Sequence, residues 1–244
     1  MNSPFSEMPD YAFPRLRKLL KGVEPSSNPL DMSIGEPKHI YPTFINEIIK
    51  SNLSALNKYP PNEGTHALIK AIDFWVRKRY RLEDFNYLNR LIVLNGSREG
   101  LFNSTLSLFP RANTSKKKYV IIPNPFYQCY LAASIAANAQ PIFVSAYKDT
   151  NYLPDLHAIP KNILDKTGIF FICSPSNPHG STADFEYWKE LINLSEKYNF
   201  RIFSDECYSE IYRDSKPLGV ISVAENMGAD LEKISVFQSL SKRS

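Results

Sequence analysis

The sequence has no run of eighteen apolar residues, which is about the length that a helix needs to cross a bilayer. Its first thirty residues mix charged side chains with prolines, whereas a signal peptide needs an apolar core. These two absences argue against a helical membrane protein and against a secreted one. We therefore expect a cytoplasmic protein without a membrane partner.

Cysteine is also scarce, since only Cys129, Cys173 and Cys207 are present and no CxxC pair occurs. Their odd number and wide spacing argue against a disulfide framework and against a zinc site. We expect no bound metal, and we interpret the three cysteines as small buried residues.

Charge of one sign is not in large excess, because the formal net charge is only +4. The densest basic run, residues 116–118, stands between a polar loop and an apolar segment, so we interpret it as a solvated loop. Nucleic-acid binding is therefore not expected. The sequence has 43% hydrophobic and 22% charged residues and no internal repeat, as is typical of a globular protein and not of a disordered chain.

Short apolar runs alternate with segments of helical periodicity. The runs lie at residues 91–94, 119–122, 141–144, 169–173, 201–203 and 234–237. Their length suits strands that are buried on both faces. Apolar residues at helical spacing indicate helices over residues 65–80 and 184–198, the second capped by Asp184 or Thr182. This alternation predicts a three-layer α/β/α fold around a mainly parallel sheet.

The front of the chain differs in composition from the rest. Residues 1–43 hold seven of the eighteen prolines and show little regular pattern beyond a short amphipathic helix at about residues 13–20. We therefore predict two parts: an N-terminal segment, residues 1–43, outside the main sheet, and a large domain, residues 44–244.

The chemistry is expected after the strands, because open α/β sheets bind ligands beyond the carboxyl ends of their strands. The polar residues at these positions are Gly96, Ser97, Tyr127, Asn177, Asp205, Tyr208, Ser239 and Lys242. Gly96 and Ser97 could hold a phosphate at a helix N-terminus, or they could only cap the helix. The phosphate-binding patterns GxxxxGK[ST] and GxGxxG are absent.

The other positions also have two readings when each is taken alone. Tyr127 could stack on a flat ring or belong to the core. Asp205 could meet a cation or cap a helix, since a carboxylate is costly to bury without a cationic partner. Asn177 is also a typical turn residue, and Lys242 is a nucleophile only if its pKa is lowered.

The succession of these residues along the chain resembles the fold-type-I pyridoxal-phosphate enzymes, specifically the class I/II aminotransferases. Gly35 in Ile34-Gly-Glu-Pro37 and Tyr59 in Tyr59-Pro-Pro-Asn-Glu-Gly64 are two further landmarks. Within the family the phrasing is most similar to the N-succinyldiaminopimelate aminotransferases. The strings that carry this likeness lie at residues 34–39, 95–99, 124–128, 205–212 and 239–244.

The resemblance implies pyridoxal 5'-phosphate as cofactor and three catalytic residues. Lys242 would bond covalently to the cofactor and then shuttle a proton. Asp205 would keep the pyridine nitrogen protonated, and Tyr208 would hydrogen-bond the ring oxygen O3′.

The resemblance also implies roles in binding. Asn177 would share the ring oxygen with Tyr208, and Tyr127 would stack on the ring. The phosphate would be held by Gly96, Ser97 and Ser239, with Tyr59 reaching it from a neighbouring subunit. The backbone near Gly35 would meet the substrate carboxylate.

Two departures from the family pattern are visible. His179 stands in Asn177-Pro-His-Gly180, where threonine is usual, and the turn should tolerate it. The sequence stops at Ser244, whereas the family continues with two arginines that bind phosphate and substrate carboxylate. We therefore expect the large domain to be incomplete and residues 1–244 alone to be inactive.

The function implied is transamination between N-succinyl-L,L-2,6-diaminopimelate and 2-oxoglutarate, in lysine biosynthesis, by a homodimer. Its small-molecule partners would be an amino acid and a 2-oxo acid. The alternatives are an aspartate or aromatic aminotransferase, a carbon–sulfur lyase, a regulator that only senses pyridoxal phosphate, and a non-catalytic fragment.

Overall fold

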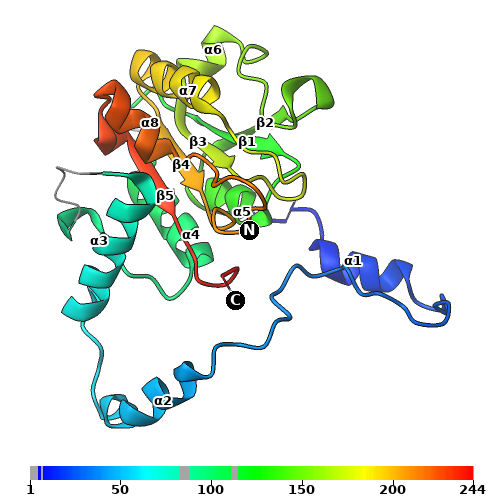
Figure 1. The fold of residues 1–244 in the computed structure, drawn as a ribbon. Coiled ribbons are helices and arrows are strands. Elements are labelled where there is room, and N and C mark those ends of the chain that lie inside the picture. The colour runs from blue at the N-terminus through cyan, green and yellow to red at the C-terminus, as the bar shows by residue number, and fades with distance from the viewer. Residues whose placement is uncertain (1–4, 7, 83–87, 111–114, 244) are drawn as a thin grey trace.

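The computed structural model describes residues 5–6, 8–82, 88–110 and 115–243 (Figure 1). Ser244, the last residue of the string at residues 239–244, lies outside these ranges. The five strands of the one sheet are β1 (Tyr119–Asn124), β2 (Gln140–Ser145), β3 (Thr167–Cys173), β4 (Arg201–Asp205) and β5 (Ile234–Phe237). They are all parallel and lie in the order β2-β1-β3-β4-β5.

Helices cover both faces of the sheet, which confirms the predicted α/β class with a parallel sheet. Along β3, Phe170 and Ile172 pack in one core with helices α7 (Phe185–Tyr198) and α8 (Val220–Met227). Ile169 and Phe171 pack in the other core, with α4 (Ser97–Leu108) and α5 (Gln128–Ala136). Figure 1 shows α7 and α8 together on one side of the strands.

Local sequence signals explain the helix boundaries. The Asp184 carboxylate accepts a hydrogen bond from the Tyr187 amide at 2.9 Å, so Asp184 and not Thr182 caps α7. The hydroxyl of Thr65 caps α3 (His66–Tyr80) in the same way. Both predicted helices are therefore confirmed.

The remaining elements are short. They are α1 (Ala12–Leu19), α2 (Phe44–Ser51), α6 (Lys161–Leu164) and the 3-10 helices η1 (Leu53–Asn57), η2 (Leu88–Arg90), η3 (Lys148–Thr150) and η4 (Leu231–Lys233). Neither α1 nor α2 buries a residue, and Figure 1 shows both on a long segment away from the sheet. The domain boundary predicted at residue 43 falls just before α2, and it stays a prediction. No helix in the described ranges is long and apolar enough to span a membrane.

The strand predicted at residues 91–94 is wrong, because these residues form no regular structure. An apolar run forms a strand only where it pairs with a neighbour and is buried there. Residues 91–94 do not join the outer edge of β5, and Ile92 is 80% exposed and Leu94 41% exposed. Leu94 still packs near Gly100 of α4, where a side chain at Gly100 would collide with it.

Candidate active site at the carboxyl ends of the strands

The carboxyl ends of the strands bring several of the predicted residues to one edge of the sheet. Asp205 ends β4, Asn177 lies in the loop after β3, and Lys242 lies in the loop after β5. Tyr127 follows β1 and precedes α5. In a parallel sheet these ends lie side by side, so residues far apart in sequence converge.

Asp205 is the most deeply placed of these residues, with only 5% of its surface exposed. The Tyr130 hydroxyl donates a hydrogen bond to Asp205 Oδ2 at 2.7 Å, and the Cys207 amide donates to Oδ1 at 3.3 Å. No salt bridge joins Asp205 to any described residue. A buried carboxylate with only neutral donors suits a cationic ligand atom such as a protonated pyridine nitrogen.

Tyr130 holds Asp205 in place. Its ring stacks on Phe171 at a centroid distance of 4.5 Å, which limits its movement. Burial, together with the nearby charge of Asp205, raises the pKa of Tyr130 well above its usual range. The hydroxyl therefore keeps its proton and remains a donor to Asp205. The sequence interpretation missed Tyr130, although it lies only three residues after Tyr127, in the first turn of α5.

Asn177 and Tyr208, which come from the loops after β3 and β4, meet in the structure. The Asn177 side-chain amide donates a hydrogen bond to Tyr208 Oη at 3.0 Å. Burial raises the pKa of Tyr208, so its hydroxyl stays protonated at neutral pH. The pair thus presents N–H and O–H donors, which suit the ring oxygen of the implied cofactor.

Lys242 lies beside this pair. Its ammonium nitrogen is 5.9 Å from the centre of the Tyr208 ring and donates a hydrogen bond to the carbonyl oxygen of Gly35. The structure therefore brings Gly35, Tyr208 and Lys242 together, although Gly35 and Lys242 are 207 residues apart. This places the Lys242 amine against the backbone segment around Gly35.

The predicted phosphate residues are only partly assembled. Gly96 and Ser97 begin α4, and no side chain caps this helix end. Uncapped amides at a helix N-terminus are suited to an anion. Ser239 makes its hydrogen bonds to Ser241, with 2.7 Å between the two hydroxyl oxygens, and not to α4.

Tyr127 and Tyr59 are placed differently. The Tyr127 hydroxyl accepts a hydrogen bond from Arg98 Nε at 2.5 Å, and its ring meets that of Tyr130 edge-on at 5.7 Å. Tyr127 therefore lies next to the group that holds Asp205. Tyr59 is 100% exposed and has no contact with the site within this chain.

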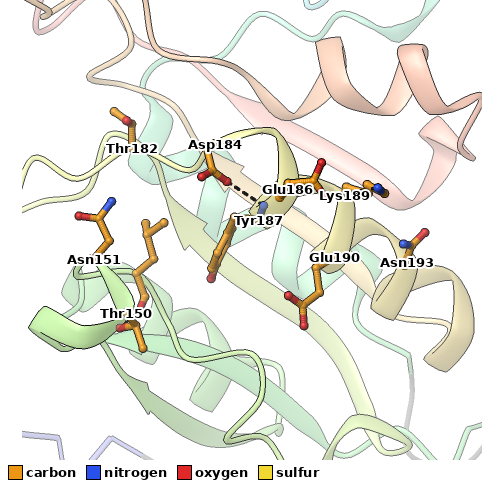
Figure 2. A pocket seen from close by; sticks show the side chains of 10 residues that line it. Thr150, Asn151, Thr182, Asp184, Glu186, Tyr187, Lys189, Glu190 and Asn193 are labelled. Carbon is orange, nitrogen blue, oxygen red and sulfur yellow. Dashed lines mark hydrogen bonds and ion pairs between the residues drawn. The ribbon is translucent and has the colours of Figure 1, made fainter.

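Two surface hollows lie away from the centre of this site. One hollow, of about 420 Å³, lies beside the start of α7, and no predicted site residue lines it. Asp184, Tyr187 and Glu190 are among the side chains that line it (Figure 2). A second hollow, of about 540 Å³, lies between Tyr11 and the Arg98–Tyr127 pair. The described residues contain no group of three or more side chains able to hold a metal ion.

The burial of the cysteine thiols can be tested by their reactivity. Burial raises the pKa of Cys129 to about 11 and raises that of Cys173 and Cys207 as well. An ordinary thiol with a pKa of about 8.5 is about one quarter ionised at pH 8, whereas a thiol of pKa about 11 is ionised to about 0.1%. We expect iodoacetamide at pH 8 to modify Cys129 at least about 100-fold more slowly in the native protein than in denaturant. Peptide mass spectrometry measures this, and equal rates in the two conditions would contradict the burial described here.

Residues 27–244 of the chain match the protein family described as aminotransferase class I and II. The LL-diaminopimelate aminotransferase of Aquifex aeolicus is 32% identical over 239 residues, which cover 96% of this chain and 59% of the relative. That of Dehalococcoides mccartyi strain CBDB1 is 31% identical, over 99% of this chain and 61% of the relative.

Solved structures of aminotransferases are also similar to this chain. An aminotransferase from Neisseria meningitidis Z2491 superimposes with a TM-score of 0.90 at 36% identity, over 100% of this chain and 62% of its own. The aminotransferase AspB from Helicobacter pylori 26695 superimposes with a TM-score of 0.86 at 32% identity, over 100% and 61%. The chain thus spans about 60% of the length of the proteins that it matches. With a match over residues 27–244 and this likeness in structure, the chain belongs to the class I and II aminotransferases, whose enzymes use pyridoxal phosphate.

Proposed function

We propose that the whole protein is a pyridoxal-phosphate-dependent aminotransferase that acts at the strand ends described above. The observation that carries the proposal is the buried carboxyl group of Asp205, which has neutral donors but no cation among the described residues. Lys242, Tyr208 and Asn177 lie nearby on the loops after β3, β4 and β5. These side chains fit three parts of pyridoxal phosphate. The Asp205 carboxylate fits the ring nitrogen, and the Lys242 amine fits the aldehyde carbon. The donors of Tyr208 and Asn177 fit the ring oxygen.

The cofactor, when bound, supplies an electron sink for charge that develops on the substrate α-carbon. Asp205, which Tyr130 holds by a hydrogen bond, would keep the ring nitrogen protonated. The Lys242 amine would hold the cofactor through its aldehyde carbon and, when free, would carry the proton to and from the substrate α-carbon. Tyr208 and Asn177, which are hydrogen-bonded to each other, would donate to the ring oxygen and orient the ring toward Lys242.

The remaining predicted residues hold the rest of the cofactor and the substrate. The amides of Gly96 and Ser97 at the start of α4, with the Ser239 hydroxyl, bind the phosphate. Tyr127 packs on the ring, and the backbone near Gly35 binds the substrate carboxylate beside Lys242.

A homodimer is part of this proposal. Tyr59 is fully exposed within one chain, which leaves it free to complete the phosphate site of a second copy. The segment of residues 1–43 would act as a small domain and dimer arm, and residues 44–244 as the cofactor-binding domain. A cytoplasmic location belongs to the same proposal.

For the substrate, two related candidates are supported by different observations. The sequences at residues 34–39 and 124–128 are similar to those of N-succinyldiaminopimelate aminotransferases, which favours N-succinyl-L,L-2,6-diaminopimelate as the substrate. The relatives named above are LL-diaminopimelate aminotransferases, which favours the free diamine. We propose the succinylated substrate with 2-oxoglutarate as the amino acceptor, and the free diamine as the second candidate.

Steady-state kinetics of the full-length protein separates these candidates. We expect kcat/KM for N-succinyl-L,L-2,6-diaminopimelate to exceed that for the free diamine by at least about tenfold, which is about 1.4 kcal/mol of transition-state binding. A reversed ratio would assign the free diamine. A preference for aspartate or tyrosine would contradict both candidates, and release of ammonia and a 2-oxo acid without an acceptor would indicate a lyase.

A further inference from the structure

Behind the site lies a buried polar network that the proposed function does not use. The Tyr80 hydroxyl donates a hydrogen bond to Glu206 Oε2 at 2.6 Å, and the Gln238 side-chain amide donates to Tyr80 Oη at 2.7 Å. Tyr80 is only 3% exposed and Glu206 only 1%. One phenol at the end of α3 thus joins the residue after Asp205 to the turn that leads to Lys242.

Both carboxylate oxygens of Glu206 accept hydrogen bonds. Glu206 Oε1 accepts hydrogen bonds from the Ser204 hydroxyl and the Val220 amide, each at 3.0 Å. Val220 begins α8, so Glu206 also ties the end of β4 to that helix. Because a carboxyl group buried this deeply is costly without partners, the three donors are needed to keep it in place.

Gln238, which donates to Tyr80, also joins the two ends of the loop that carries Lys242. Gln238 Oε1 accepts from Arg243 Nη2 at 3.0 Å, so residues on both sides of Ser239 and Lys242 are tied to each other. Gln238 Nε2 also donates to the Ser209 hydroxyl at 3.1 Å. The Arg243 guanidinium lies 4.0 Å from the centre of the Trp75 ring, which anchors the far end of the loop on α3.

Close packing leaves the network little freedom. A side chain at Gly219 would collide with the Tyr80 ring and would stand 2.8 Å from Glu206 Oε2. The backbone of residue 219 therefore presses directly on the Tyr80–Glu206 pair. Any other residue at this position would have to displace the phenol or the carboxyl group.

We propose that Tyr80, Glu206 and Gln238 are positioning residues that set the distance between the Asp205 carboxyl group and the Lys242 amine. This inference rests on the proposed function, because it assigns the network a role in that site. Each of the two site residues lies within four positions of a network residue, on separate strand ends. The backbone ladder between these strands ends with the bond from the Glu206 amide to the Phe237 carbonyl at 2.9 Å, so beyond that point side-chain contacts such as those of Tyr80 and Ser209 with Gln238 connect the two loops. A displacement of about 1 Å between reacting groups can cost about 100-fold in rate.

The test is Tyr80→Phe in the full-length protein, since phenylalanine keeps the ring and removes only the hydroxyl. We expect kcat to fall about 5- to 30-fold with KM for the amino donor changed less than about twofold, because orientation and not substrate binding is altered. We also expect the dissociation constant for pyridoxal phosphate, measured by fluorescence quenching, to rise about fivefold. The second readout does not depend on turnover.

Tyr187→Phe is the matched control. Its hydroxyl is also partly buried and donates one hydrogen bond, to the Pro154 carbonyl at 2.9 Å, but Tyr187 lies in the first turn of α7, away from the network. We expect this variant to lose similar thermal stability while kcat and cofactor affinity stay at wild-type values. If Tyr80→Phe and Tyr187→Phe lower Tm equally and both leave kcat and cofactor affinity unchanged, the positioning role is wrong.

A second substitution tests the polarity of the network. In Glu206→Gln the NH2 group of the new side chain would face the Tyr80 hydroxyl. That hydroxyl would then receive hydrogen bonds from this group and from the Gln238 amide, and it would lose its own acceptor. We expect the same split between kcat and KM as in Tyr80→Phe, and a double variant no worse than either single one. Fully additive losses would show that the residues do not act as one unit. If the wild-type protein itself fails to bind pyridoxal phosphate, the proposed function fails, whatever the variants do.

Discussion

Replacing Lys242 by alanine is expected to abolish covalent retention of pyridoxal phosphate and to lower kcat by at least about 10³-fold. General acid–base catalysis by one positioned side chain contributes about 10²- to 10⁴-fold, and the lysine also supplies the bond to the cofactor. The structure supports Lys242 because its amine lies beside Tyr208 and the Gly35 carbonyl. Sodium borohydride reduction followed by peptide mapping measures which lysine carries the cofactor.

Lys166→Ala is the control for this experiment. Lys166 is exposed, and its hydrogen bonds with Lys118, Tyr119 and Ile163 use only its backbone. We expect this variant to retain the adduct and full activity. An adduct found on Lys166 or Lys233 in the wild-type protein would overturn the assignment of Lys242.

Asp205→Asn is expected to lower kcat on the order of 100-fold, or about 2.7 kcal/mol, with the cofactor still bound. An amide is of almost the same size as the carboxyl group but cannot hold the ring nitrogen in its protonated form. Oδ1 can still accept from the Cys207 amide, so the local fold should remain. Stopped-flow absorbance of the bound cofactor, after mixing with the amino donor, measures the slowed step.

Asp155→Asn is the matched control. Asp155 Oδ1 also accepts backbone hydrogen bonds, from His157 at 3.0 Å and Ala158 at 3.2 Å, but it lies in the loop before α6. We expect wild-type turnover from this variant. Turnover within about twofold of wild type in Asp205→Asn would remove Asp205 from the proposed mechanism.

Apolar runs predicted five strands of the sheet, because a strand buried on both faces must be apolar along its whole length. The run at residues 91–94 has the same character but forms no strand. The difference lies in pairing and burial, since the run does not join the outer edge of β5 and leaves Ile92 80% and Leu94 41% exposed. An apolar run indicates that a segment can be buried in a sheet, and it does not indicate whether the tertiary structure pairs it there.

The site could be predicted only as a set of positions. Their place after each strand indicated that Asn177, Asp205 and Lys242 lie at one edge of the sheet. The contacts with Tyr130 and Arg98 were not foreseen, because a phenol and a guanidinium in helices have many ordinary roles. Tyr59 remains apart from the site, so its role in binding phosphate stays a prediction about a second copy.

By itself the sequence determined the five strands of the sheet, the helices over residues 65–80 and 184–198, the choice of Asp184 or Thr182 as a cap, and the chemical types that follow each strand. These are local properties, written in the spacing of apolar residues and in side chains that bond their own backbone. Only the tertiary structure decided that Tyr80 joins Glu206 and Gln238, residues 126 and 158 positions away. Hydrogen bonds between such distant residues leave no periodic trace in the sequence, because they depend on how α3 packs beside the ends of β4 and β5.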